Sequence, residues 1–133
     1  MDIYEKFQCI GGKCPDSCCV GWTIPINMES VKQYQKMQSS YSKKVLENIE
    51  SVGENYRIKL TQSGRCPFLN NQNLCDIYIH ISPEAMFPVC QTYPRKIKRY
   101  YNMTIITLYI SCPEVCRMLL EKSEYISWGY AED

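Results

Sequence analysis

The sequence predicts a small α+β domain stapled by metal-bound cysteines, with several helices, short strands and much irregular backbone. Three observations indicate this class. Helical and strand-like patterns both occur along the 133 residues, nine residues are cysteine, and glycine and proline stand beside many of the cysteines. A chain of this length usually forms one domain with a modest core, which a staple would help to stabilise. We therefore expect residues 1–133 to form a single cysteine-rich metal-binding domain.

The first 25 residues are expected to be irregular, because glycine and proline interrupt any helical pattern there. The interrupting residues are Gly11, Gly12, Pro15, Gly21 and Pro25. Four cysteines fall within this stretch, so their thiols are expected to lie on turns.

Residues 27–52 are predicted to be helical, with Asn27 or Ser30 as the N-cap. Apolar side chains recur there at helical spacing, at Val31, Tyr34, Met37, Tyr41, Val45, Leu46 and Ile49. Ser39 and Ser40 are expected to divide the stretch into two helices. We interpret the apolar stripe as facing the core rather than lining a ligand groove.

The middle of the chain is predicted to contain short elements. Residues 56–60 alternate in the manner of a strand. Residues 76–82 fit either a strand or a short helix, because periodicity does not separate the two at this length. Residues 83–87 begin with proline and are expected to open a helical turn.

The last third is predicted to hold a strand and then a helix. Residues 103–110 are apolar and β-branched, which makes them the best strand in the sequence. Residues 111–122 are predicted to be a helix with Ser111 as N-cap, Glu114 three residues later and Pro113 in the first turn.

Composition limits the function classes. The net charge of +1 indicates no preference for nucleic acid or membrane surfaces. No window approaches the length of apolar sequence that spans a membrane, and the N-terminal residues lack the basic and apolar regions of a signal peptide. A cytoplasmic, reducing location is therefore expected, where cysteine clusters more often bind metal or perform redox chemistry than form disulfides.

The nine cysteines are spaced as metal ligands often are. Their spacings are C-x4-C-x3-C-C near the N-terminus, C-x8-C-x14-C in the middle and C-x21-C-x3-C beyond it. A thiolate site needs backbone loops that curl round one centre, and glycine and proline favour such curls. No two cysteines have the C-x2-C spacing of a zinc ribbon, and one histidine cannot complete a Cys2His2 site. Soft thiolates favour zinc, copper(I) or iron–sulfur clusters.

The chain resembles the bacterial flagellin lysine-N-methylases of the FliB type and, more broadly, the cysteine-cluster or zinc- or iron-chelating domains. The resemblance rests on four blocks in order, CIGGKCPDSCCVGW, CPFLNNQNLC, CQTYPRK and SCPEVCRMLL. It implies an iron–sulfur protein that transfers methyl groups from S-adenosylmethionine to lysines of flagellin. The match is to the N-terminal cysteine-rich part of longer enzymes, and no G-x-G-x-x-G loop for S-adenosylmethionine is present.

The resemblance also implies which cysteines are ligands. Eight are shared with the family, namely Cys9, Cys14, Cys18, Cys19, Cys66, Cys75, Cys90 and Cys112. Cys116 is expected to be extra. One 4Fe–4S cluster needs four thiolates, so either two centres exist or some cysteines are spare. For a first site we favour Cys14, Cys18, Cys66 and Cys90. The adjacent Cys18 and Cys19 are expected to serve different centres, or one of them to pack.

Several other side chains are expected to lie near the metal. Trp22 and Phe68 are predicted to cover the cluster and exclude water, and Asp16 and Ser17 to donate or accept hydrogen bonds around the sulfurs. Arg95 either offsets the charge of a thiolate cluster or holds a carboxylate of a partner, or it lies on a surface turn, and the sequence leaves these readings open.

The function hypothesis is therefore an iron–sulfur protein, with zinc as the second choice of metal, that resembles protein lysine N-methylases and acts on or docks a flagellin-like protein. S-adenosylmethionine is a cofactor by resemblance only. The alternative is a non-enzymatic metal-binding module for electron transfer, metal carriage or partner docking. A redox-sensing regulator is a third class.

Overall fold

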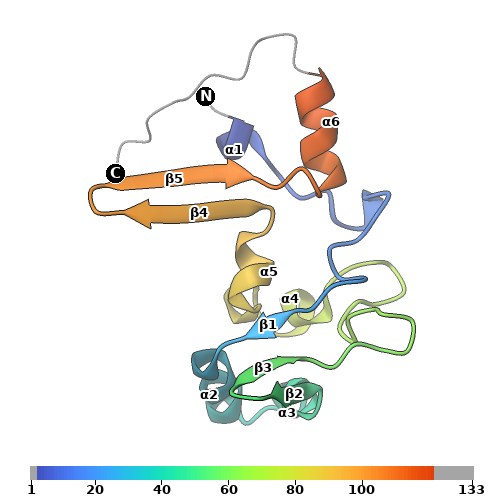
Figure 1. Ribbon diagram of the computed structural model, residues 1–133. Helices are drawn as coiled ribbons and strands as arrows, with labels where there is room; N and C mark the ends of the chain where they lie inside the picture. Colours follow the sequence, from blue (N-terminus) through green and yellow to red (C-terminus); the bar gives the residue numbers. More distant parts are fainter. Residues whose placement is uncertain (1–2, 122–133) are drawn as a thin grey trace. The chain divides into compact units, whose positions relative to one another are not determined.

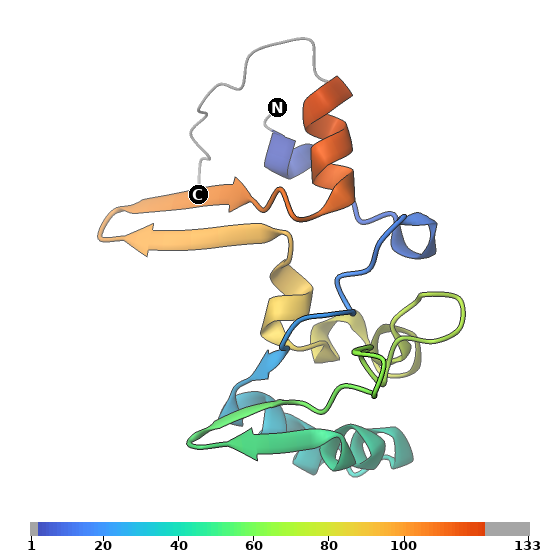
Figure 2. The ribbon, with the colours of Figure 1, turned by 45° about the vertical axis from the view of Figure 1, so that its right-hand side comes forward.

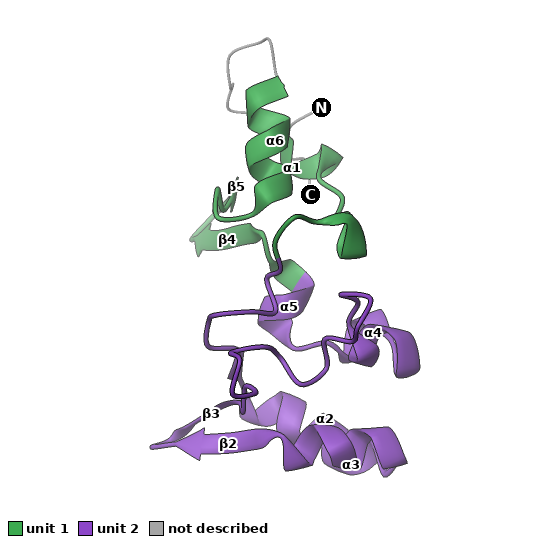
Figure 3. Ribbon diagram, turned by 90° about the vertical axis from the view of Figure 1, so that its right-hand side faces the viewer, with its two compact units in different colours: residues 1–16, 92–133 green, residues 17–91 purple. Residues whose placement is uncertain are grey.

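A computed structural model of the protein describes residues 3–121 (Figure 1). It confirms the predicted α+β class, with helices and short antiparallel strands. The chain divides into two compact units (Figure 3). Unit 1 is formed by residues 1–16 and 92–133, and unit 2 by residues 17–91. The expectation that residues 1–133 are a single metal-binding domain stays a prediction.

Unit 2 holds most of the regular structure. Its elements are β1 (Pro25–Ile26), α2 (Met28–Met37), α3 (Ser40–Glu47), β2 (Ile49–Val52), β3 (Asn55–Ile58), α4 (Asp76–His80), the 3-10 helix η2 (Pro83–Ala85) and α5 (Pro88–Thr92), whose last residue belongs to unit 1. The three strands form an antiparallel sheet in the order β1-β3-β2. The segment that fitted either a strand or a helix is the helix α4, and the predicted turn at residues 83–87 contains η2.

Local capping sets the first two helices of unit 2. The side chain of Asn27 accepts a hydrogen bond from the Ser30 N–H at 2.9 Å, so Asn27 is the N-cap of α2. The chain then breaks at Gln38, which has a left-handed backbone with φ of 48°. Ser39 and Ser42 exchange side-chain and backbone hydrogen bonds at 3.0 Å, a capping box that starts α3. The predicted N-cap and the predicted division are both confirmed.

The predicted helix over residues 27–52 is too long. It ends at Glu47, and β2 (Ile49–Val52) pairs with β3 from Ile49↔Ile58 to Val52↔Asn55. A positive φ of 62° at Gly53 allows the turn between these strands. The β-branched residues at both ends of β2 suit the strand, but the pairing that selects it comes from a partner strand that helical periodicity does not report.

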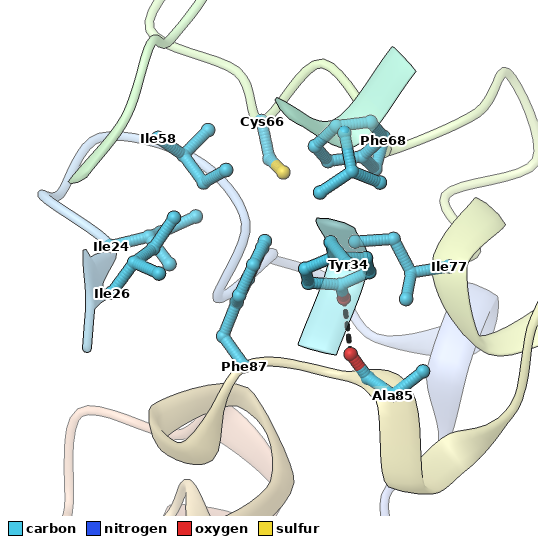
Figure 4. Close-up of a cluster of buried hydrophobic side chains, with 10 residues drawn as sticks. Ile24, Ile26, Tyr34, Ile58, Cys66, Phe68, Ile77, Ala85 and Phe87 are labelled. Carbon is cyan, nitrogen blue, oxygen red and sulfur yellow. Dashed lines mark hydrogen bonds between the residues drawn. The ribbon is translucent and has the colours of Figure 1, made fainter. Parts of the chain in front are cut away.

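The core of unit 2 is one cluster of buried side chains, shown in Figure 4. Its members are Ile24, Ile26, Tyr34, Val45, Ile58, Cys66, Phe68, Ile77, Ala85 and Phe87. The predicted apolar stripe of α2 and α3 contributes to this core through Tyr34 and Val45. Val31, Tyr41, Leu46 and Ile49 pack against this core, which confirms that the stripe faces the core except at Met37, which is exposed.

Unit 1 contains α1 (Ile3–Lys6), the 3-10 helix η1 (Gly11–Lys13), β4 (Arg95–Tyr100), β5 (Met103–Leu108) and α6 (Pro113–Glu121). The predicted strand at residues 103–110 is confirmed as β5 and lies beside α1 (Figure 2). Its partner β4 was not predicted, because four of its six residues are lysine or arginine and it lacks the apolar alternation of a strand. The hairpin partner makes this stretch a strand.

The predicted N-cap of the last helix is wrong by one residue. Since α6 begins at Pro113, Cys112 rather than Ser111 precedes it. Pro113 does lie in the first turn, as predicted. Glu114 does not reach back to the cap, because its two carboxylate oxygens accept hydrogen bonds from Arg117 at 2.6 and 2.9 Å.

Candidate metal centre

In unit 2, backbone hydrogen bonds hold the loop that carries Cys18 and Cys19 against the loop that carries Cys66. Val20 and Arg65 form an isolated antiparallel bridge. Next to it, the N–H of Cys66 donates to the carbonyl of Cys19 at 2.7 Å. The turn that carries Cys18 and Cys19 is therefore fixed against Cys66, although 47 residues separate Cys19 from Cys66 in the sequence.

Two glycines allow this approach. The N–H of Gly21 donates to the carbonyl of Gly64 at 2.9 Å. Both residues have positive φ, 81° at Gly21 and 74° at Gly64, a backbone conformation that is strained for residues other than glycine. A side chain at Gly64 would meet only the Gly21 nitrogen, at 3.9 Å, so the backbone angle rather than crowding requires glycine here.

The loop between Cys66 and Cys75 is closed by a second bridge. Leu69 pairs with Cys75, and the N–H of Asp76 donates to the Phe68 carbonyl at 2.7 Å. The Asn70 side chain also donates to the Asp76 carboxylate at 3.0 Å. This closure returns the chain to the core, so Cys75 packs against the same side chains as Cys66.

Burial differs among the thiols of unit 2. Cys66 is 6% exposed, and Figure 4 shows its sulfur pointing into the core cluster. Cys75 and Cys90 are half-buried and pack against that cluster, whereas Cys18 is exposed. Cys19 also packs against the core.

Four of these thiols act on one another electrostatically. Burial raises the pKa of Cys90 to about 12, and the neighbouring Cys66, Cys75 and Cys18 add to the rise. Burial likewise raises the pKa of Cys66 to about 11, with Cys75 and Cys18 adding to it. The pKa of Cys75 is raised by burial and, to a smaller extent, by Asp76 and Cys18. Cys18, Cys66, Cys75 and Cys90 therefore form one group, which we call the unit 2 thiol cluster.

Backbone N–H groups oppose the effect of burial at two of these sulfurs. At Cys66 the N–H groups of Phe68 and Leu69 lower the thiol pKa. At Cys75, which precedes α4, the N–H groups of Ile77 and Tyr78 do so, although no hydrogen bond of ordinary capping geometry is formed there. In both cases the donors lie two and three residues after the cysteine. Such donors stabilise a thiolate and tune a metal bound to it.

The pKa values decide which chemistry the cluster can perform without metal. A thiol with a pKa of about 12 is ionised at pH 7 in roughly one molecule in 100,000. Because the thiolate is the reactive form, these buried thiols are poor nucleophiles and poor redox sensors. A coordinating metal deprotonates a thiol outright, so the raised pKa does not prevent these sulfurs from serving as metal ligands.

Aromatic side chains surround the cluster. Phe68 and Tyr34 are buried in the same core as Cys66, and Tyr34 lies 5.7 Å from Phe87, measured between ring centroids. Burial raises the pKa of Tyr34, and Cys75 and Cys90 add to the rise. The Trp22 indole N–H donates to the Cys18 carbonyl. Apolar side chains of this kind limit solvent access to a metal on the side of the core, whereas Cys18 is exposed.

Ser17 and Arg95 make backbone contacts that their predicted roles did not include. The Ser17 hydroxyl accepts a hydrogen bond from the N–H of Cys19 at 3.2 Å and so shapes the turn that carries Cys18 and Cys19.

One guanidinium nitrogen of Arg95 donates to the carbonyls of Tyr4 and Phe7, at 3.1 and 3.0 Å, at the end of α1. A cation at a helix C-terminus stabilises the unpaired carbonyls there, so Arg95 has a structural role within unit 1.

The remaining candidate ligands lie in unit 1. Cys112 is buried, and burial raises its pKa, with further contributions from Cys14 and Cys9. Our preferred first-site set, Cys14 with Cys18, Cys66 and Cys90, thus differs by one residue from the unit 2 thiol cluster, which contains Cys75 in place of Cys14. The sequence did contain a signal that Cys75 lies near Cys66. The C-x8-C loop between them is short, and short loops keep their ends close together.

No ready-made metal geometry is found within residues 3–121, where no three side chains among Cys, His, Asp and Glu form a group that could hold an ion. All nine cysteines are thiols. Binding at the unit 2 thiol cluster therefore requires the sulfurs to approach one another. The donor set itself fits a soft metal, because four thiolates are the ligands that zinc and iron–sulfur clusters take.

A family model with the description "CxxCxxCC: Putative zinc- or iron-chelating domain" matches residues 8–128. The chain belongs to this family. The spacing in the family title differs from that of the chain, which has C-x4-C-x3-C-C over residues 9–19. Membership confirms the resemblance from which the eight candidate ligands were taken, and the ligand assignment itself stays a prediction.

Curated relatives carry flagellar and methylase names. A "Flagellar biosynthetic protein FliU" of Salmonella muenchen is 30% identical over 129 residues, which cover 92% of this chain and 76% of the relative. Two proteins named "Lysine-N-methylase", from Salmonella typhimurium and Salmonella choleraesuis, are each 30% identical over 86% of this chain. The match spans only 30% of the length of either methylase. No solved structure matches the chain.

No helix among residues 3–121 combines the length and the apolar character that crossing a bilayer requires.

Proposed function

We propose that Cys18, Cys66, Cys75 and Cys90 of unit 2 ligate a metal centre, with a 4Fe–4S cluster as the favoured cofactor and zinc as the second choice. The observation that carries this proposal is the grouping of Cys66, Cys75 and Cys90 in one apolar core. The exposed Cys18 adds to the pKa rise of each of the three thiols. Four thiolates are the full ligand set of either cofactor. The centre would add a link between three loops that otherwise meet through backbone bridges and the shared core of unit 2.

The N–H groups beside the sulfurs support an iron–sulfur cluster as well as zinc. Hydrogen bonds to sulfur and burial are two of the means by which proteins set cluster potentials. Phe68, Leu69, Ile77 and Tyr78 would supply the donors, and the aromatic core would exclude water. A reducing, cytoplasmic location is part of the proposal, because the thiols have to stay unoxidised.

Anaerobic purification followed by elemental analysis tests this proposal. We expect iron and acid-labile sulfide, with visible charge-transfer absorption, or zinc in a colourless protein. Cys90→Ala should lose the centre. Cys19→Ala is the matched control, because Cys19 packs against the same core but is not among the thiols that raise the pKa of Cys90. Equal retention of metal by both variants would contradict the ligand set.

We further propose that the domain functions in protein-lysine N-methylation and that it acts on, or docks, a flagellin-like protein. The support is its similarity to the FliU protein and the lysine-N-methylases. In the proposed reaction the lone pair of a neutral lysine nitrogen attacks the methyl carbon of S-adenosylmethionine. The bond between sulfur and methyl breaks and leaves a thioether, and the methylated nitrogen releases a proton to solvent. The binding site for the methyl donor is not assigned to residues of this chain.

A non-enzymatic metal-binding module is the second candidate, for electron transfer, metal carriage or partner docking. It is favoured by the 30% coverage of the methylases, which leaves most of their length without a counterpart here. Calorimetric titration of the metal-loaded chain with S-adenosylmethionine separates the two. Binding supports the methylase proposal, whereas absence of binding together with capture of flagellin supports a docking module.

A further inference from the structure

The β4–β5 hairpin of unit 1 has an open edge. Within residues 3–121 these two strands form a sheet of their own, so no strand lies along the outer edge of β4 (Figure 1). An open edge carries a row of backbone N–H and C=O groups with which another extended chain can pair. The outer edge of β4 is therefore a place where a partner strand can be added.

The hydrogen-bond ladder fixes which backbone groups of β4 point outward. The Tyr109 N–H donates to the Pro94 carbonyl at 2.8 Å, and from there the register runs along β4 without a bulge. In an antiparallel ladder, pairs that exchange hydrogen bonds alternate with pairs whose N–H and C=O groups point away from each other. The second kind falls at Ile97 and Arg99. Neither N–H donates to a residue outside the hairpin in the described part of the chain.

The same edge is strongly basic. Four of the six residues of β4 are lysine or arginine, and neither strand of the hairpin contains a carboxylate. Arg95 is engaged with the carbonyls at the end of α1, and the Lys96 ammonium lies 5.4 Å from the centroid of the Tyr109 ring. Lys98 and Arg99 are exposed, and neither forms an ion pair with any residue between 3 and 121. These two charges are open to a partner.

The charges select the kind of strand that can pair with this edge. Two copies of β4 placed edge to edge would bring cation against cation, and lysine on an edge strand prevents such pairing. An acidic strand reverses this repulsion. Ile97, which is 45% exposed, lies on the same face as Arg99, while Lys98 lies on the other face. A complementary strand therefore carries an acidic side chain opposite each cation and an apolar one opposite Ile97.

We propose that the outer edge of β4 binds an extended acidic segment of another protein as an added strand. Backbone hydrogen bonds to Ile97 and Arg99 supply affinity, and acidic residues opposite Lys98 and Arg99 supply selectivity. This interaction goes beyond the proposed function, because it needs neither the metal centre nor methyl transfer.

Single-stranded RNA is the competing partner for a basic strand next to aromatic side chains. Tyr100 and Tyr101, at the turn of the hairpin, are exposed and could stack on bases. A nucleic acid cannot continue a β-ladder, however, and it would leave the outward N–H groups of Ile97 and Arg99 unpaired. The net charge of +1 also supplies little general attraction for phosphate. These points favour a protein segment.

Fluorescence anisotropy of a labelled peptide, titrated with the full chain, tests this interaction. The peptide contains Glu-Glu-Val-Glu, which places its acidic residues opposite Arg99, Lys98 and Lys96 and its valine opposite Ile97 in an antiparallel pairing. A peptide with glutamine in place of each glutamate should bind at least about tenfold more weakly. Absence of binding by the acidic peptide, or binding of poly(U) RNA in its place, would overturn the assignment.

Charge reversal locates the surface. Lys98→Glu/Arg99→Glu should weaken peptide binding about tenfold or more. Lys32→Glu/Lys43→Glu is the matched control, because it makes the same change in net charge at exposed positions of α2 and α3. The control should keep the affinity within about twofold. Equal affinities of the two double variants would mean that the peptide binds elsewhere.

Two N-methylated peptides test the added strand. Methyl groups on the backbone nitrogens of alternate residues remove the donors along one edge of the peptide and leave those along the other. Only one edge can face β4, so one version should lose binding and the other should keep it. Equal affinities of the two versions would overturn strand pairing.

Metal content separates this interaction from the proposed function. Lys98→Glu/Arg99→Glu should contain as much metal as the wild-type chain, because the proposed ligands lie in unit 2. Cys90→Ala should lose its metal and still bind the peptide, because the β4–β5 hairpin belongs to unit 1. Loss of peptide binding in Cys90→Ala would contradict the independence of the two.

Discussion

The hydroxyl of Tyr34 in α2 donates a hydrogen bond to the backbone carbonyl of Ala85, across the core of unit 2 (Figure 4). Ala85 ends η2, and Cys90 follows in α5. The bond therefore joins the helix that begins at Asn27 to the segment that positions one of the proposed ligands. Both residues are buried, so neither group can exchange this bond for water.

Tyr34→Phe should lower the free energy of unfolding by about 1–3 kcal/mol, because the buried Ala85 carbonyl loses its partner. Urea denaturation of the metal-free chain measures the change. Tyr78→Phe is the control, because Tyr78 is 55% exposed and its substitution should change the free energy by no more than about 0.5 kcal/mol. A Tyr34→Phe variant as stable as the control would contradict the role of this bond.

Alkaline pH should destabilise the metal-free protein. The ordinary thiol pKa is 9.0, and folding raises it to about 11 at Cys66 and about 12 at Cys90. Above pH 9 the unfolded chain therefore releases protons that the folded chain retains, and the free energy of unfolding falls with rising pH. The contribution of these thiols is fully present below pH 9 and is lost as the pH approaches 11 to 12.

Urea denaturation at several pH values above neutrality measures this slope. Lysine and tyrosine also titrate there, so Cys90→Ala is the comparison that isolates the thiol. The variant should show a shallower fall than the wild-type chain. If the free energy of unfolding fell equally with pH in the variant and the wild-type chain, Cys90 would have the same pKa in the folded and unfolded states.

Gly64→Ala should weaken metal binding at the unit 2 thiol cluster. Alanine at a φ of 74° costs about 1–2 kcal/mol, and relaxation of that strain would shift the bridge that fixes Cys19 against Cys66. Gly53→Ala is the matched control, with a φ of 62° in the turn of the β2–β3 hairpin. Both variants should lose similar stability, but only Gly64→Ala should bind Co²⁺, whose thiolate complexes absorb visible light, more weakly. Equal Co²⁺ affinities of the two variants would show that the turn at Gly64 does not position the metal site.

Arg95→Lys should destabilise unit 1 by about 1–3 kcal/mol, because an ammonium group does not reproduce the guanidinium hydrogen bonds to Tyr4 and Phe7. Hydrogen exchange should show faster exchange of the Phe7 amide, which bonds to Ile3 in α1. Arg99→Lys, at an exposed position of β4, should change the free energy by about 0.5 kcal/mol or less. Unchanged protection of Phe7 in Arg95→Lys would exclude the anchoring role.

Local signals in the sequence predicted the starts of α2 and α3. Asn27 and Ser39 satisfy backbone N–H groups within three residues of themselves, so their capping needs no distant partner. The strands were harder to predict. β2 falls within the helix predicted over residues 27–52 and β4 was not predicted, because each is stabilised by pairing with another strand.

The sequence by itself determined the α+β class, the main helix starts and the soft-metal character of the donors, since these depend on residue types and on spacing within a few residues. Only the tertiary structure decided which thiols stand together. Cys75 joins Cys18, Cys66 and Cys90, while Cys9 and Cys14 act on Cys112. Such grouping depends on which distant loops are joined by backbone bridges and a shared core. Spacing along the chain does not encode that for cysteines as far apart as Cys18, Cys66 and Cys90.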